Sequence, residues 1–275
     1  MPRMFRDWKI ALAAIGFLNA QGPGAAETYP DFESQWRSTA GGDAWDPTRP
    51  AGLAQQAPLT AEYQAIFESS LKDQAAGGHG NNYRSSCVLG GMPRMMGLTS
   101  PMEILIQPRL TFMIFQDAFT RRIHTDGAAM PANELPSFQG YSIGKWIDDG
   151  NGRYEALEIE THNFKGPRAL DQTGLPLHRD NQTVVRERLY LDKNNNDLLH
   201  DDITTIDHAF THPWSVLKTY TREHNPRWAE YSCEPPAGSV FIGLDEYRVS
   251  PDGKLKPLYD TQPAPDLRYF KPASK

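Results

Sequence analysis

From residue 101 onward, the chain contains short runs of apolar residues or of alternating apolar and polar residues. Turn-forming residues separate these runs. A β-strand sends successive side chains to opposite faces, so runs of this kind predict strands. The first two predicted strands, Met102–Gln107 and Leu110–Asp117, are rich in Ile, Leu and Phe. The others are Thr120–Asp126, Ser142–Asp148, Arg153–Phe164, Thr183–Asp192, Leu198–Phe210, Trp214–Glu223, Arg227–Cys233, Val240–Val249 and Lys254–Leu258.

Short turns rather than helices join these strands. Asp149–Gly152 and Lys193–Asp197 are typical hairpin turns, and the succession of strands predicts an antiparallel meander. A long meander has to protect its edge strands, and closure into a barrel is the simplest way to do so. The fold class is therefore predicted to be mainly β, with residues 101–260 closed or nearly closed into a calycin-like barrel. A two-sheet β-sandwich is the alternative.

One helix is predicted, over residues 60–76. Thr60 is a favourable N-cap, and Gly77 ends the helical pattern. The apolar stripe of this helix consists of Tyr63, Ile66, Phe67 and Leu71. We expect residues 27–100 to supply an extended aromatic arm, this helix and a loop, all packed on the barrel. Residues 261–275 are expected to form an extended, Pro-containing tail.

The N-terminal segment resembles a secretory signal peptide. Met1–Lys9 is basic, Ile10–Leu18 is apolar, and Asn19–Ala26 is a stretch of mostly small residues. The apolar run is shorter than the ~20 residues that a transmembrane helix needs. We therefore expect cleavage near Ala26 and an exported, periplasmic or secreted protein without a transmembrane segment.

Charge and cysteine content narrow the functional classes. The net charge is −6 and the basic residues are scattered, so no surface for a nucleic-acid partner is expected. In an exported protein the only two cysteines, Cys87 and Cys233, are expected to form a disulfide. Its loop of about 146 residues would contribute about 5 kcal/mol in the chain-entropy model. Two separate buried thiols are the alternative.

The first candidate for catalytic chemistry is a set of polar residues in the third predicted strand. Arg122, His124 and Asp126 occupy alternate positions and so share one face. Asp126 could orient His124 for proton transfer, and Arg122 could stabilise a developing negative charge. A solvated hairpin face ending in an ordinary Asp-Gly turn explains the same residues.

Two further groups contain acid–base residues. Glu158 and Glu160 share a strand face with His162, where these side chains could bind a metal, perform acid–base work or contact a ligand, although an outward polar face gives the same alternation. In the loop before Thr183, His178 could act as a base with Asp180 as its partner. That segment is about equally consistent with a loop that is held by hydrogen bonds from its side chains to the backbone.

Ligand-lining residues are expected to be mostly apolar, because small-molecule pockets combine many apolar groups with few polar ones. The candidates for this lining are Arg94, Met95, Met96, Phe112 and Trp146. The methionines are better explained as lining or core than as copper ligands. A metal site made by His200, Asp202 and His208 is disfavoured, since residues 200 and 208 lie about 26 Å apart on a straight strand at roughly 3.3 Å per residue. No cofactor or metal is predicted.

Several motifs together resemble a large group of uncharacterised exported bacterial proteins. They are Cys87 followed by Gly91–Met96, then Arg121–Gly127, Gly140–Trp146, Pro213-Trp214 and Tyr231–Glu234. Members of that group typically carry Tyr where His124 stands, so the resemblance implies Arg121, Arg122 and Asp126 as its shared polar residues. The strand pattern is also loosely similar to that of calycin barrels. Neither resemblance implies a particular reaction.

The sequence thus leaves three functional classes open. In the first, an internal cavity acts on a small, mostly apolar molecule as a cofactor-independent hydrolase, lyase or isomerase. In the second, the same cavity carries such a ligand without catalysis, as a lipocalin-like protein does. The third is a structural envelope protein without a cavity.

Overall fold

A computed structural model describes residues 28–40, 44–83, 90–116, 120–230, 239–242, 245–249, 254–257, 262–265 and 268. The predicted signal peptide and the predicted disulfide between Cys87 and Cys233 lie outside these residues. Within the described part, no helix is long and apolar enough to cross a membrane.

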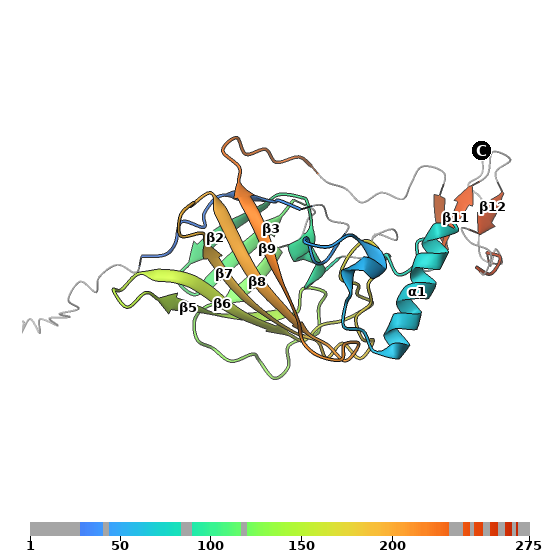
Figure 1. The fold of residues 1–275 in the computed structure, drawn as a ribbon, viewed down its shortest axis with the longest axis horizontal. Helices are drawn as coiled ribbons and strands as arrows, with labels where there is room; N and C mark the ends of the chain where they lie inside the picture. The colour runs from blue at the N-terminus through green and yellow to red at the C-terminus, as the bar shows by residue number, and fades with distance from the viewer. Residues whose placement is uncertain are drawn as a thin grey trace, which may run out of the picture.

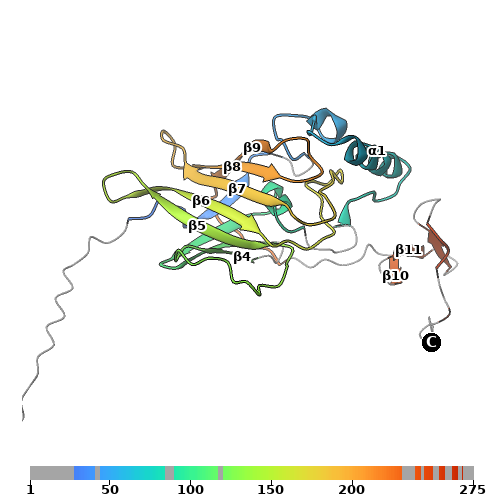
Figure 2. The same ribbon diagram turned by 90° about the horizontal axis from the view of Figure 1, so that it is seen from below.

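The described strands β1 to β9 form a closed barrel, which confirms the predicted fold class and excludes the two-sheet sandwich (Figure 1). Each strand pairs with its neighbours in sequence, and β1 also pairs with β9. Figure 2 shows β4 to β9 following one another around the wall of the barrel. The strands are β1 (Gln35–Ser38), β2 (Met102–Gln107), β3 (Leu110–Phe115), β4 (Thr120–His124), β5 (Tyr141–Asp148), β6 (Tyr154–His162), β7 (Val184–Leu191), β8 (Leu198–Ile206) and β9 (Trp214–Arg222).

The N-terminal arm supplies the strand that closes the barrel. In β1, Trp36 lies opposite Met102 of β2 on one side and opposite Arg222 of β9 on the other. Its ring is fully buried, and the Arg222 guanidinium lies 4.5 Å from the ring centroid. The arm was expected to pack on the barrel, whereas the structure shows that it also forms part of the wall.

One pair of neighbouring strands is parallel, in contrast to the predicted antiparallel meander. Ile123 of β4 lies opposite Ser142 of β5 in parallel register. Parallel neighbours need a connection that returns to the starting end of the first strand. The loop over residues 125–140 provides this connection.

The last strands do not join the barrel. β10 (Ser239–Ile242), β11 (Asp245–Val249) and β12 (Leu255–Pro257) form a separate three-stranded sheet, which both views show outside the barrel. An ion pair of 3.1 Å between His79 and Glu246 connects this sheet to the segment after α1. The predicted strand at Arg227–Cys233 is not a strand over its described residues 227–230.

The predicted helix is confirmed as α1 (Ala61–Ala75). Thr60 caps it, because its side chain accepts a hydrogen bond from the Tyr63 N–H at 3.4 Å. Two short 3₁₀ helices, η1 (Gly52–Gln55) and η3 (Arg94–Gly97), flank α1 in sequence. Met95 and Met96 of η3 are fully buried in the hydrophobic core.

Closure of the barrel gives each strand an inner face, and that face contains charged side chains. The cross-strand register places Arg121, Glu187, Asp201 and Lys218 at buried positions. Arg121 donates to both carboxylate oxygens of Glu187 and to the hydroxyls of Ser142 and Thr161 at 3.2 and 2.9 Å. This bidentate pair and its hydroxyl partners satisfy a guanidinium that is only 1% exposed.

The second pair of interior charges is organised differently. Asp201 lies opposite Lys218 in the register, but the Lys218 ammonium donates to the Trp45 carbonyl and lies 4.0 Å from the centroid of the Trp45 ring. Burial lowers the pKa of Lys218 to about 8. Burial, together with the nearby charge of Glu187, raises the pKa of Asp201 well above its ordinary value. The interior therefore favours neutral Asp201.

We expect Arg121→Met to lower the free energy of unfolding by about 3–5 kcal/mol, because it leaves the Glu187 charge buried without its partner. The double variant Arg121→Met/Glu187→Leu should regain most of this loss, since neither charge then remains. Urea unfolding followed by circular dichroism measures both. Arg186→Met is the matched control, because it breaks an exposed pair with Glu160 and should cost at most about 1 kcal/mol. Equal losses of unfolding free energy in the single and double variants would contradict the conclusion that Arg121 neutralises the buried Glu187 charge.

Candidate functional site

The end of the barrel at which β6 ends and β7 begins carries a cleft of about 510 Å³, here called the barrel-end cleft. One wall comes from the loop over residues 125–140, and the other from residues 162–165 and 180–183. Its lining mixes apolar and polar groups, including Met130, Pro136, Phe164, Lys165, Asp180 and Gln182. Seven of its ten lining residues are polar or charged, so the cleft is more polar than the mostly apolar pocket expected from the sequence.

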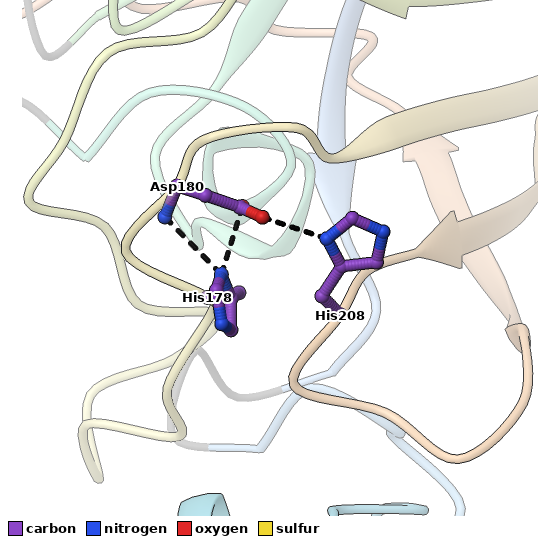
Figure 3. A group of neighbouring side chains, drawn as sticks. All are labelled: His178, Asp180 and His208. Carbon is purple, nitrogen blue, oxygen red and sulfur yellow. Dashed lines mark hydrogen bonds and ion pairs between the residues drawn. The ribbon is translucent and has the colours of Figure 1, made fainter.

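Three side chains with acid–base and ligating chemistry meet beside this cleft, and one of them, Asp180, lines it. We call His178, Asp180 and His208 the Asp180 cluster (Figure 3). One carboxylate oxygen of Asp180 lies 2.9 Å from Nδ1 of His178, and the other lies 2.6 Å from Nδ1 of His208. A single carboxylate thus holds two imidazole rings, which meet edge to face with their centroids 5.7 Å apart.

Buried Asp207 explains why two loops distant in sequence come together here. One of its carboxylate oxygens accepts hydrogen bonds from the N–H groups of His178 at 2.8 Å and Ala209 at 2.9 Å. The other oxygen accepts a hydrogen bond from the Thr183 hydroxyl. Because these bonds join the loop before β7 to the turn after β8, they fix the backbone on both sides of the cluster.

Helix α1 supports the cluster from behind. The hydroxyl of buried Tyr63 accepts a hydrogen bond of 3.2 Å from the Arg179 N–H. The Tyr63 ring also packs against the ring of His178, with the centroids 5.1 Å apart. The apolar stripe that predicts α1 therefore also positions a polar loop.

The electrostatics of the cluster favour its charged forms. Desolvation of Asp180 opposes ionisation, but hydrogen bonds from the Gln182 N–H, His208 and His178 outweigh it and lower the pKa to about 2. The pKa of His208 is raised, first by its hydrogen bond with Asp180 and then by the Asp180 charge. At neutral pH the cluster thus holds an ionised carboxylate beside an imidazole that binds a proton more readily than usual.

The arrangement permits two kinds of chemistry. Asp180 engages Nδ1 of each ring, and within the described residues no hydrogen bond engages either Nε2 atom. Each ring could therefore transfer a proton at Nε2, with Asp180 setting its orientation. The same three side chains could instead hold a metal ion, because two imidazoles and one carboxylate are a common ligand set.

The sequence predicts one part of this cluster and misses another. The structure brings His178 and Asp180 together, as the loop hypothesis expects. The sequence pattern groups His208 only with His200 and Asp202, and His200 in fact pairs with Asp192 at 3.3 Å. The antiparallel hairpin of β7 and β8 was the missed signal, because it places the residues just after β8 beside those just before β7.

The other predicted catalytic residues do not join the cluster. Arg122 and His124 share one face, as predicted, but that face is the outer one. Arg122 is exposed and lies 5.9 Å from the centroid of the half-buried Phe112 ring, while His124 stacks on Tyr141 at 4.4 Å. Asp126 pairs with Arg109 at 3.0 Å and caps the turn at Ala128.

The predicted ligand-lining residues lie in three different places. Arg94 is buried beside Met95 and Met96, and its guanidinium donates to Asn82 at 2.8 Å. Trp146 is half-buried at the opposite end of β5 from the cleft, where it packs against Phe32 and Tyr29. Phe112 lies on the outer face. None of these residues lines the barrel-end cleft.

Glu158 and Glu160 line a second groove, of about 480 Å³, on the outer face of β5 to β8. Glu158 pairs with Arg188 at 2.8 Å, and Glu160 pairs with Arg186 and His162, each at 2.7 Å. Hydrogen bonds from His162 and Arg186 lower the pKa of Glu160. The charges of this groove neutralise one another, as expected for a solvated strand face.

Comparison with protein-family models, with curated proteins and with solved structures finds no match. The resemblance to exported bacterial proteins therefore stays a prediction.

The raised pKa of His208 can be measured by NMR titration of the ring protons in chelator-treated protein. We expect a value above the ordinary 6.5, falling toward 6.5 in Asp180→Asn because that variant removes the charge. The sign follows from linkage: the His208 contribution to stability is present below pH 6.5 and is lost as the pH rises through the raised pKa. An unchanged His208 pKa in Asp180→Asn would show that the two groups are not coupled.

Proposed function

We propose that the protein is an exported enzyme that acts on a small molecule bound in the barrel-end cleft, with the Asp180 cluster as its reactive group. One observation carries the proposal: Asp180 lines the cleft, and its two carboxylate oxygens lie 2.9 and 2.6 Å from the Nδ1 atoms of two histidines. Reactive groups placed on loops of a rigid scaffold are typical of enzymes built on β-barrels. The signal-like N-terminal segment supports export.

The packing of the barrel favours a ligand site in the barrel-end cleft rather than in an internal chamber. The inner faces of the middle strands are filled, and Arg121, Thr161 and Asp201 are almost inaccessible to water. Met95 and Met96 add further packing from η3. A ligand carrier of the lipocalin type needs an internal chamber, so this alternative is less well supported than action at the barrel end.

The lining of the cleft suggests the class of substrate. Met130, Pro136 and Phe164 offer apolar contacts, whereas Lys165 and Gln182 offer hydrogen-bond donors. The Lys165 ammonium lies 4.9 Å from the centroid of the Phe138 ring, which keeps this positive charge near the cleft. A small, partly apolar molecule with an anionic or carbonyl oxygen would match both surfaces.

The chemistry of the cluster suggests the class of reaction. An imidazole oriented by a carboxylate can remove a proton from water or from a carbon beside a carbonyl, and a second imidazole can return one. Hydrolysis of an ester or lactone and isomerisation through proton transfer both fit these roles. The Arg122, His124 and Asp126 set is not part of this proposal, because it lies away from the cluster on the outer face.

The test is a panel of chromogenic carboxylic esters and lactones assayed with the purified mature protein. For any substrate that is turned over, we expect Asp180→Asn to lower kcat/KM by about 10²–10⁴-fold, the usual contribution of general acid–base catalysis. The variant keeps the size of the side chain but removes the charge that orients both rings.

Asp197→Asn is the matched control. Asp197 also pairs with a histidine, His224, at 2.9 Å, but it lies at the other end of β8 and away from the cleft. We expect its kcat/KM to stay within about twofold of the wild-type value. Equal activity of Asp180→Asn and the wild type would overturn the proposal.

A further inference from the structure

We propose that the Asp180 cluster binds one divalent transition-metal ion of the zinc class through His178, Asp180 and His208. The proposal rests on the function proposed above in placing a substrate beside the ion, whereas ion binding itself can be tested alone. It goes further by naming an electrophile for the site, which would take the place of direct proton transfer by the two imidazoles.

The geometry of the three side chains supports an ion. Their ligating atoms all lie within 4.8 Å of one another, and the carboxylate oxygens are 2.9 and 2.6 Å from the two Nδ1 atoms. Ligand atoms about 2.0–2.2 Å from a zinc ion are spaced only slightly further apart than this. An ion between these atoms therefore requires only small movements of the three side chains, and Asp207 already holds the backbone at His178 and Ala209.

The type of ligand narrows the choice of ion. Two imidazole nitrogens and one carboxylate oxygen suit zinc and its first-row neighbours, whereas magnesium and calcium prefer oxygen ligands. Three protein ligands also leave a coordination position open, as in catalytic zinc sites. The side chains of His178, Asp180 and His208 are 28%, 32% and 68% exposed, so water or a substrate can reach that position.

The local charge also favours a cation. Asp207 is buried directly beneath the cluster and adds a second carboxylate within the same loop junction. Arg168 is buried nearby and donates to the Thr183 hydroxyl at 2.5 Å, and that hydroxyl in turn donates to Asp207. Its positive charge therefore offsets only part of the negative charge of the two carboxylates. An ion at the cluster would neutralise Asp180 without displacing the bonds that Asp207 makes.

Other histidine–carboxylate pairs on the molecule provide an internal comparison. His162 pairs with Glu160, His200 with Asp192 and His224 with Asp197, and each of these pairs has a single imidazole. In the part of the chain that the structure describes, the Asp180 cluster is the one group of three such side chains that converge. The proposal thus depends on the second imidazole, and His208 is the residue that distinguishes this site.

The experiment is isothermal titration of zinc chloride into the chelator-treated mature chain at neutral pH. We expect one ion per chain in the wild type and at least tenfold weaker binding in His208→Ala and in Asp180→Asn. His208 is the better first variant, because its side chain is largely exposed and its loss should leave the fold intact. His224→Ala is the matched control and should bind zinc as the wild type does.

Two outcomes would overturn the proposal. One is the absence of zinc binding at tens of micromolar, and the other is one-to-one binding that His208→Ala leaves unchanged. Magnesium chloride in place of zinc should give no measurable heat of binding, and tighter binding of magnesium than of zinc would also contradict the ligand set. Loss of esterase activity in Asp180→Asn without any zinc binding would reject the metal ion while leaving the proposed enzyme in place.

Discussion

Closure of the barrel by β1 is the constraint on which the rest of the structure depends. Trp36 joins β2 to β9 and thereby turns a curved sheet into a wall with a fixed inside and outside. Every second side chain of each strand then points into a water-poor interior, so charged side chains at these positions need partners. Arg121 and Glu187 satisfy one another there, and with Met95 and Met96 they help to fill the space that a ligand would otherwise occupy.

A filled interior shifts the accessible chemistry to the ends of the barrel. The parallel pairing of β4 and β5 requires the long loop over residues 125–140, and this loop forms one wall of the barrel-end cleft. The hairpin of β7 and β8 brings His178 and His208 together beside Asp180, which lines the opposite wall, and Asp207 and Tyr63 hold their loops. The cluster is therefore organised before any ligand binds, which limits the loss of side-chain freedom on binding.

The sequence predicts the strands well because their period of two follows from local geometry, whereas pairing between distant segments leaves little local signal. The run Gln35–Ser38 is too short to show alternation, so the closing strand was missed. Arg121 and Arg122 are adjacent and chemically alike, and only closure decides which of them points inward. Likewise, β10 to β12 have the same pattern as the barrel strands but form their own sheet, since sheet membership depends on tertiary contacts.

The proposed function requires small molecules to bind at the Asp180 cluster in the barrel-end cleft and not inside the barrel. The most direct measurement is a crystallographic screen in which crystals of the mature protein are soaked with a library of small fragments. We expect fragments in the cleft, in contact with Asp180 or His208 and with Phe164 or Lys165. Fragments bound inside the barrel, with Met95 and Met96 displaced from the Arg121–Glu187 pair, would contradict the proposed function.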